Sequence, residues 1–342
     1  MLDRATPLAI YMEGAVGEIA GKMGYGVLRY SPNPVACVID STKAGQDIVA
    51  LVGSPRACPI VATIDEAYAL GARAMVLGIA PPGGALPNEW FKDLDEAVSR
   101  GMSLVNGLHD RLAPRYSNLK PGQNIWDVRV EPEGLGIGMA RARELDNKRL
   151  LMIGTDMAIG KMTAGLEIVR AARAAGVRAE FVATGQIGIV VSGRGVPLDA
   201  IRLDFASGAI EREVMAAADA ELIVVEGQGS LIHPASSANL PLLRGSCPTH
   251  LILCHRAGQK TLVRLPRIAI PPLKDYIRMY EDLATACGTY PRPKTVAVSL
   301  NTAHVATDDE ARDACDAVSQ ETGLVCTDPV RFGADVLLAA LN

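Results

Sequence analysis

The chain has 342 residues, which is too long for one small core and suits two domains of ordinary size. Hydrophobic residues make up 49% of it and aromatic residues only 4%, so the interior has to be aliphatic, as in parallel sheets covered by helices. The formal net charge of -4 excludes the strongly basic surface that binds nucleic acid or an anionic membrane, and it favours a protein that acts on small molecules.

The first third of the sequence alternates short apolar runs with helical patterns. We expect strands at residues 8–12, 35–39, 60–62, 74–79 and 103–105, and helices at residues 63–70 and 88–100. Strands that alternate with helices indicate parallel βαβ units. Residues 1–112 are therefore predicted to form a Rossmann-like three-layer αβα domain.

Residues 113–147 read differently, because Pro114, Pro121 and Pro132 and several glycines interrupt any long element. We expect an extended connector here, with short strands near residues 126–130. A second strand–helix series then begins, and residues 148–342 are predicted to form a P-loop NTPase-like αβα domain. Its expected strands are 150–153, 179–183, 222–225, 251–254 and 295–299, and its expected helices are 162–175, 203–217 and 308–321.

The strand at residues 150–153 runs directly into a glycine-framed loop that ends in Gly160 and Lys161. Such a turn aims backbone N–H groups at one point, where the start of the next helix favours an anion. The usual signature, G-x-x-x-x-G-K-[ST], has a hydroxyl after the lysine, but here Met162 follows and Thr163 carries the first hydroxyl. We predict a phosphate-binding loop without an assigned metal ligand; the alternative is a tight turn with a surface lysine. The cofactor-binding candidates are Gly154, Thr155, Asp156, Gly160, Lys161, Met162 and Thr163.

Two further loops follow predicted strands. Glu226 ends an apolar strand and precedes Gly227 and Gly229, and Gly185 and Gln186 follow another strand. Ligands of open α/β sheets collect beyond the carboxyl ends of the strands, so Gly185, Gln186, Gly227 and Gly229 join the cofactor-binding candidates. Glu226 can orient a reactant there, or it can simply be a carboxylate that caps a turn.

Histidines and arginines at strand ends supply the remaining candidates. His233 follows the loop of Glu226, His255 ends a further apolar strand, and imidazole is suited to proton transfer near neutral pH. Guanidinium groups can clamp a substrate carboxylate, although a solvated surface pair is the ordinary alternative. We take as catalytic candidates His233, Glu226, Lys161 and His255, and as substrate-binding candidates His109, Arg111, Arg129 and Arg256.

Several motifs occur together in order: Gly-Thr-Asp-x-x-x-Gly-Lys-Met at residues 154–162, Ala-Thr-Gly-Gln-x-Gly at 183–188, Glu-Gly-Gln-Gly-Ser-Leu-x-His-Pro at 226–234 and Leu-Cys-His at 253–255. This combination resembles the DUF1611 family, a bacterial and archaeal group that includes D-glutamate N-acetyltransferases. Gly-Leu-His-x-Arg-Leu at 107–112 extends the similarity into the first domain. The resemblance implies an acetyl-CoA-dependent N-acetyltransferase that acts on a D-amino acid such as D-glutamate.

Two looser similarities bear on the ligand. The loop, together with Glu-Gly-x-Gly at 226–229, is similar to dethiobiotin synthetase and related ATP-using proteins, in which a threonine follows the lysine. Residues 58–67 and 71–82 look like the CoA-binding domain of succinyl-CoA synthetases. Met162 at the threonine position favours acetyl-CoA over ATP with Mg²⁺. An ATP/Mg²⁺-dependent kinase or ligase, and a nucleotide- or CoA-binding protein without turnover, stay open as alternatives.

The remaining expectations concern compartment and partners. Seven scattered cysteines without a C-x-x-C pair favour reduced thiols over disulfides or a zinc site. The sequence shows neither a signal-peptide pattern nor an apolar stretch long enough to span a bilayer. We expect a cytoplasmic homo-oligomer with a small-molecule substrate and no nucleic-acid or membrane partner.

Overall fold

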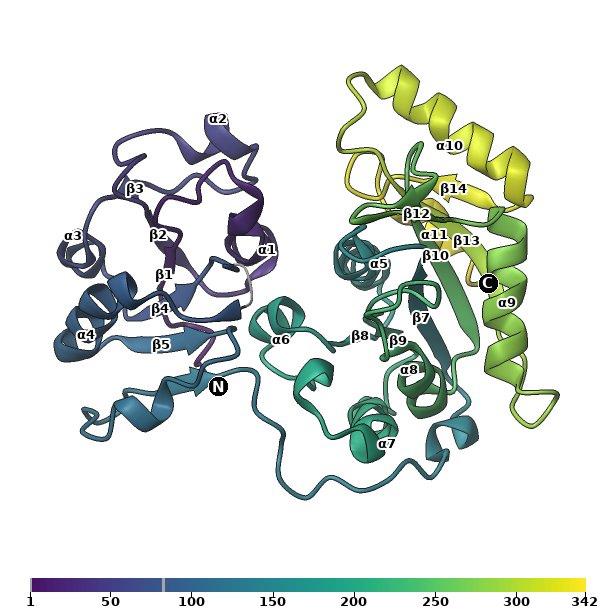
Figure 1. Ribbon diagram of the computed structural model, residues 1–342, viewed down its shortest axis with the longest axis horizontal. Coiled ribbons are helices and arrows are strands. Elements are labelled where there is room, and N and C mark those ends of the chain that lie inside the picture. Colours follow the sequence, from purple (N-terminus) through teal and green to yellow (C-terminus); the bar gives the residue numbers. More distant parts are fainter. Residues whose placement is uncertain (1, 82–83) are drawn as a thin grey trace. The chain divides into compact units, whose positions relative to one another are not determined.

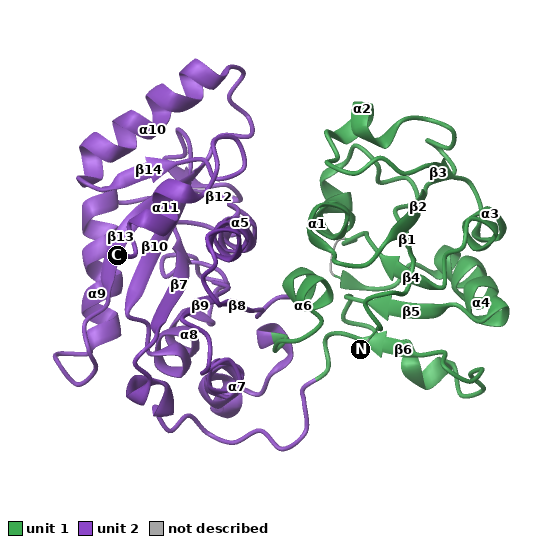
Figure 2. Ribbon diagram, turned by 180° about the vertical axis from the view of Figure 1, so that it is seen from behind, with its two compact units in different colours: residues 1–130, 186–197 green, residues 131–185, 198–342 purple. Residues whose placement is uncertain are grey.

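The computed structural model describes residues 2–81 and 84–342, which fall into two compact units (Figures 1 and 2). Unit 1 consists of Met1–Val130 and Gln186–Pro197, and unit 2 of Glu131–Gly185 and Leu198–Asn342. The chain therefore crosses between the units after residues 130, 185 and 197.

Unit 1 is built on a parallel sheet with the strand order β3-β2-β1-β4-β5-β6, which is the Rossmann order. Its central strands are fully buried and mostly aliphatic, as a sheet covered on both faces requires. The strands are β1 (Leu8–Tyr11), β2 (Val35–Ile39), β3 (Ile60–Val61), β4 (Ala74–Leu77), β5 (Ser103–Asn106) and β6 (Ile125–Asp127).

Helices cover both faces of this sheet. In Figure 1, α1 and α6 lie on one face, and α3 and α4 lie on the other. Helix α3 begins at a capping box, in which Thr63 and Glu66 each bond to the other's backbone. The helices of unit 1 are α1 (Lys22–Tyr30), α2 (Ile48–Val52), α3 (Ile64–Ala69), α4 (Phe91–Arg100) and α6 (Gln186–Ser192).

Unit 2 has a second parallel sheet, with the order β14-β13-β10-β7-β9-β8. The central strand β7 lies between β10 and β9, so a loop at its carboxyl end stands in the middle of that sheet edge. The strands are β7 (Lys148–Gly154), β8 (Ala179–Val182), β9 (Leu222–Val225), β10 (His250–Arg256), β13 (Lys294–Asn301) and β14 (Val325–Thr327); β11 (Thr261–Leu262) and β12 (Leu265–Ala269) form a separate antiparallel pair.

The helices of unit 2 also cover both sheet faces. Helix α5 lies on one side and α9 on the other in Figure 1. Gly165 lets α5 approach the sheet closely, because a Cβ at this position would lie 2.9 Å from the ring of Phe181 on β8. The helices are α5 (Lys161–Ala174), α7 (Leu203–Met215), α8 (Asn239–Ser246), α9 (Leu273–Thr285), α10 (Asp308–Thr322) and α11 (Asp335–Ala339).

The two parallel-sheet units confirm the predicted fold class. Two segments are used differently from expectation. The short strand expected in the connector is β6, which pairs with β5 and becomes the edge strand of the first sheet. Residues 186–188, expected in a strand-end loop at 183–188, instead begin α6, which belongs to unit 1. The connector is thus divided, with residues 113–130 in unit 1 and residues 131–147 in unit 2.

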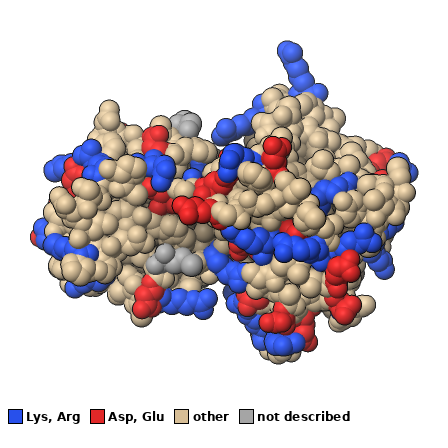
Figure 3. Space-filling view, turned by 90° about the horizontal axis from the view of Figure 1, so that it is seen from below, with Lys and Arg blue, Asp and Glu red and all other residues tan. Residues whose placement is uncertain are grey.

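Charged side chains of both signs occur on the face shown in Figure 3, where Asp and Glu lie beside Lys and Arg. Some of the surface arginines are paired: Arg202 Nη2 lies 2.6 Å from Glu131 Oε1, and Arg178 Nε lies 3.0 Å from Glu221 Oε2. Within residues 2–81 and 84–342, no helix combines the length and the apolar character needed to cross a membrane.

Candidate functional site

The loop between β7 and α5, residues 155–160, is the P-loop predicted from the sequence. Gly160 has a φ of +106°, a conformation that only glycine adopts readily, and α5 begins at the next residue. In the described part of the chain, the backbone N–H groups of residues 159–163 have no protein acceptor. Five consecutive unpaired donors at a helix start form a cradle for an anion.

Lys161 is the first residue of α5, and its side chain is almost completely buried. Its Nζ donates a hydrogen bond to the backbone oxygen of Asp156 at 2.8 Å. Burial lowers the pKa of Lys161 to about 8, with Asp156 and Glu226 among the groups that oppose the shift. A phosphate in the cradle would complete the electrostatic environment of this ammonium group.

Asp156 orders the loop. Its Oδ2 accepts hydrogen bonds from Gln259 Nε2 at 2.6 Å and from the backbone N–H of Val263 at 2.9 Å, and its Oδ1 accepts one from the N–H of Met157. Arg256 also reaches the loop, where Nη2 donates to the backbone oxygen of Ala158 at 3.1 Å. The Asp156 carboxylate is therefore occupied by the protein itself. No group of three or more His, Cys, Asp or Glu side chains suited to a metal ion occurs among the described residues.

His255, on β10, contacts the first residue of the P-loop. Its Nδ1 lies 2.8 Å from the hydroxyl of Thr155, and both side chains are buried. Burial lowers the pKa of His255 to about 4, so the imidazole is neutral at physiological pH. Tyr276 and Ser230 add further support, because their hydroxyls donate to the backbone oxygens of Gly154 and Thr155. Tyr276 had no recognisable signal in the sequence, since it lies in an ordinary amphipathic helix.

Glu226 stands at the carboxyl end of β9, beside β7. Its Oε2 accepts hydrogen bonds from the backbone N–H groups of Thr184 at 2.9 Å and Gly185 at 3.0 Å. Burial raises its pKa to about 7, although these N–H groups and Lys161 oppose the shift. The structure thus brings Lys161 and Glu226 into one buried electrostatic environment, and each has a pKa close to neutral pH.

Packing explains two of the predicted cofactor-binding glycines. A Cβ at Gly227 would lie 1.6 Å from the backbone oxygen of Met152, so β9 and β7 approach each other too closely there for any side chain. A Cβ at Gly185 would lie 2.6 Å from Nε2 of Gln228. Their predicted contact with a cofactor stays a prediction.

His233 lies in the loop that follows Glu226 and is partly exposed. Its Nδ1 accepts a hydrogen bond from the backbone N–H of Ala235 at 3.1 Å. In this tautomer, Nε2 carries the proton and is a donor. His233 has no hydrogen bond to Glu226 or Lys161 within the described structure, so the geometry suits a donor to a substrate better than a base.

The other predicted substrate-binding residues lie in unit 1. His109 and Arg111 are exposed there, and Arg129 is partly buried close to residue 130. Gln186, a predicted cofactor-binding residue, begins α6 and also belongs to unit 1. Of the predicted substrate-binding set, Arg256 is the residue that unit 2 holds at the P-loop.

The turn between β1 and α1 in unit 1 is also rich in glycine, but the N–H groups of residues 14–18 bond within the protein. Asp40 accepts from the N–H groups of Gly14 and Val16, at 3.2 and 3.0 Å, and the hydroxyl of Tyr25 accepts from that of Gly17 at 2.8 Å. Residues 159–163 differ from this turn, because their N–H groups have no protein acceptor in the described part of the chain.

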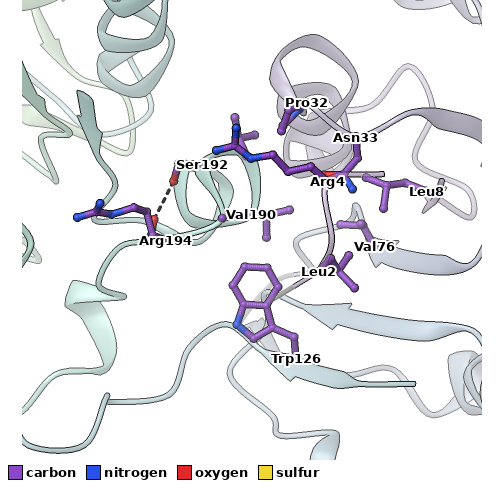
Figure 4. A pocket seen from close by; sticks show the side chains of 12 residues that line it. Leu2, Arg4, Leu8, Pro32, Asn33, Val76, Trp126, Val190, Ser192 and Arg194 are labelled. Atoms are coloured by element: carbon purple, nitrogen blue, oxygen red, sulfur yellow. Dashed lines mark hydrogen bonds between the residues drawn. The ribbon is translucent and has the colours of Figure 1, made fainter. Parts of the chain in front are cut away.

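Each unit has a cavity. In unit 1 a cavity of about 260 Å³ lies between the amino end of the sheet and α6, and Trp126, Arg4 and Asn33 help to line it (Figure 4). In unit 2 a cavity of about 400 Å³ opens beside the P-loop. The second cavity adjoins the unpaired N–H groups.

The free N–H groups, the buried lysine and the acid on the neighbouring strand define unit 2 as a P-loop domain, with a methionine at the position of the usual magnesium-ligating hydroxyl. The chain belongs to the DUF1611 family. The family's P-loop domain matches residues 136–338 and its Rossmann-like domain matches residues 41–131, and both are described as domains of unknown function.

Similar proteins extend this assignment. The chain is 36% identical to a D-glutamate N-acetyltransferase from a Pseudoalteromonas species, over 82% of this chain and 84% of that protein. It is 33% identical to a D-glutamate N-acetyltransferase from Tritonibacter scottomollicae, over 98% of each chain. A crystal structure of a DUF1611 family protein from Anabaena variabilis matches with a TM-score of 0.94 and 46% identity, over 98% of this chain and 99% of that one. The predicted family membership is confirmed.

Proposed function

We propose that this protein is an acetyl-CoA-dependent N-acetyltransferase that acts on a D-amino acid such as D-glutamate. The two relatives named as D-glutamate N-acetyltransferases support the reaction class. One observation carries the proposal: the unpaired N–H groups of residues 159–163 occur in the same unit as the buried side chains of Lys161 and Glu226.

The residues of the P-loop fit the phosphates of this cofactor. The N–H groups of residues 159–163 and the ammonium group of Lys161 complement a diphosphate. Met162 offers no hydroxyl to Mg²⁺, and Asp156 is already bonded within the loop. CoA phosphates need no metal for transfer of the acetyl group, because the bond that breaks lies at the distant thioester.

The chemistry can be assigned to the chain's own side chains. Acetyl-CoA supplies a thioester, whose C–S bond breaks as a C–N bond to the amine forms. Two N–H groups hold Oε2 of Glu226, and the Gln228 side chain also interacts with this carboxylate. We assign to Oε1 the proton from the attacking amine. Its raised pKa makes the carboxylate a stronger base than an exposed glutamate. His233, through Nε2, supplies a donor for the developing oxyanion, whereas Lys161 binds the phosphates.

The experiment combines acetyl-CoA with a panel of D- and L-amino acids and measures free thiol release together with the mass of the product. We expect thiol release that depends on a D-amino acid and a product heavier by one acetyl group. The variant Lys161→Ala, shown to be folded, should lose this activity. ATP with Mg²⁺ is assayed in parallel. ATP turnover without any acetyl transfer would contradict the proposal and favour the kinase or ligase alternative.

A further inference from the structure

The cavity of about 400 Å³ beside the P-loop has two walls of different origin. One wall comes from the P-loop and the first turns of α5. The other comes from the carboxyl ends of β13 and β14 and the loops that follow them. The lining residues are Ile159, Gly160, Thr163, Ala164, Ser299, Leu300, Asn301, Ala303, Asp328, Pro329, Val330 and Arg331.

Hydrogen bonds fix the second wall. The carboxylate of Asp328 accepts from the N–H and hydroxyl of Thr302, at 2.9 and 2.6 Å, and from the N–H groups of Val330 and Arg331, at 2.9 and 3.2 Å. One carboxylate thereby ties the loop after β13 to the loop after β14. The cavity is therefore formed before any ligand binds.

Asn301 joins the two walls. Its Nδ2 donates to the backbone oxygen of Ile159 at 3.3 Å, and its Oδ1 accepts from the N–H of Ala303 at 3.0 Å. Since the polar groups of Asn301 and Asp328 bond within the wall, aliphatic side chains, Pro329 and backbone supply most of the surface offered to a ligand. Such a preformed apolar slot suits a flat heterocycle better than a charged or extended polar group.

The strand order gives the ligand a direction. Strands β13 and β14 lie on one side of β7, beyond β10, whereas β9 and β8 lie on the other. The cavity is on the first side, and Glu226 and its partner Thr184 are on the second. A ligand whose phosphates occupy the cradle at residues 159–163 can therefore place one end in the cavity and the other beside Glu226.

We propose that this cavity holds the adenine ring of acetyl-CoA, so that the pantetheine arm runs across the P-loop and presents the thioester on the Glu226 side of the sheet. The inference rests on the proposed function, because it assumes that the phosphates of this cofactor bind the P-loop. The inference adds that the adenine end of the cofactor lies on the β13 side of β7 and the thioester end on the β9 side. The loops after β13 and β14 would then determine the affinity for the cofactor and not the rate of acetyl transfer.

The test fills the cavity by a substitution in the wall opposite the P-loop, so that no P-loop residue is changed. Ala303 is exposed and lines the cavity, so Ala303→Phe places a ring in the slot without disturbing the core. The matched control is Ala174→Phe, an exposed alanine at the far end of α5. Val330→Trp, at a cavity residue that is 45% exposed, is a second variant in case the first does not fold. Each is assayed with acetyl-CoA and with S-acetyl-4′-phosphopantetheine, which lacks the adenosine 3′,5′-bisphosphate half of the cofactor.

For acetyl-CoA, we expect Ala303→Phe to raise KM at least tenfold and to leave kcat within about twofold. The KM for S-acetyl-4′-phosphopantetheine should not change, and Ala174→Phe should behave as wild type with both. Unchanged kinetics with acetyl-CoA in a folded variant would overturn the inference alone. Equal losses with both substrates would overturn it too, since they would place the pantetheine arm in the cavity. A wild-type protein that neither binds acetyl-CoA nor transfers its acetyl group would refute the proposed function as well.

Discussion

The buried carboxylate of Glu226 gives the sharpest prediction. Replacing it with glutamine keeps the size of the side chain and an oxygen that can accept from the N–H groups of Thr184 and Gly185. The substitution removes only the ability to ionise. Any difference between the wild type and Glu226→Gln that depends on pH therefore reports on this one group.

The magnitude follows from the raised pKa. The ordinary pKa of a glutamate is 4.5, and the pKa of Glu226 in the folded protein is about 7. This difference corresponds to a free energy of about 3 kcal/mol. Because the folded state holds the proton more tightly than the unfolded state, the free energy of unfolding falls as pH rises between these two values. This stabilisation is complete below pH 4.5 and is lost as pH rises through about 7. Glu226→Gln should lack this fall, so its stability relative to the wild type should increase by up to about 3 kcal/mol between pH 4.5 and pH 8.

Chemical denaturation of both proteins across this pH range measures the difference, in which the contribution from His255 largely cancels. Lys161 interacts with Glu226, so its own titration adds to the difference near pH 8. Glu221→Gln is the matched control, because Glu221 is exposed and lies just before the opposite end of β9. In kinetics, Glu226→Gln should lower kcat by roughly 10²–10⁴ and remove a rising limb of activity near pH 7. A variant that keeps both the wild-type kcat and the same pH profile of stability would refute the reasoning.

Three further predictions concern the P-loop and the neighbouring loop after β9. Lys161→Met should weaken CoA binding by about 2 kcal/mol or more, and binding to the wild type should weaken as pH rises above about 8, where the ammonium group loses its proton; calorimetry that shows pH-independent affinity would contradict this. Gly227→Ala should lower Tm by at least about 5 °C, because its Cβ would overlap a backbone oxygen, whereas Gly136→Ala, with open space around its Cβ, should change Tm little. EDTA should leave CoA affinity unchanged within about twofold, because Met162 provides no magnesium ligand, and a metal-dependent affinity would show this interpretation to be wrong.

Local patterns were sufficient to predict the core of the site. An apolar strand followed by Gly160 and Lys161 predicts the loop conformation directly, because strand, turn and helix start are all encoded within a few residues. The position of Glu226 followed from a general property of parallel sheets, whose strand ends share one edge. The fold class was predictable for the same reason, since alternating strands and helices permit few arrangements.

Features that depend on distant packing were not predictable in the same way. Residues 186–192 form a short apolar segment, and such a segment suits a buried strand, a helix or a loop equally well. Tertiary contacts, such as those with α1, place this segment in unit 1. The pairing of Thr155 with His255 joins residues 100 positions apart, so no sequence spacing reveals it. His255 was predicted as a catalytic candidate from its type and strand-end position. The structure gives it a buried, neutral, supporting environment, and its catalytic role stays a prediction.

The crossing of the chain after residues 130, 185 and 197 affects how the protein can be made. Helix α6 completes unit 1, yet the ribosome synthesises it only after β7, α5 and β8 of unit 2. During translation, the strands of unit 1 are synthesised before α6. The surface that Val190 and Val191 of α6 help to cover is therefore still exposed at that stage. A gene truncated after residue 130 would encode a unit that lacks one of its own helices, and a gene started at residue 131 would encode that helix without its sheet. A recombination event that separates residues 1–130 from the rest of the gene should therefore leave unit 1 incomplete.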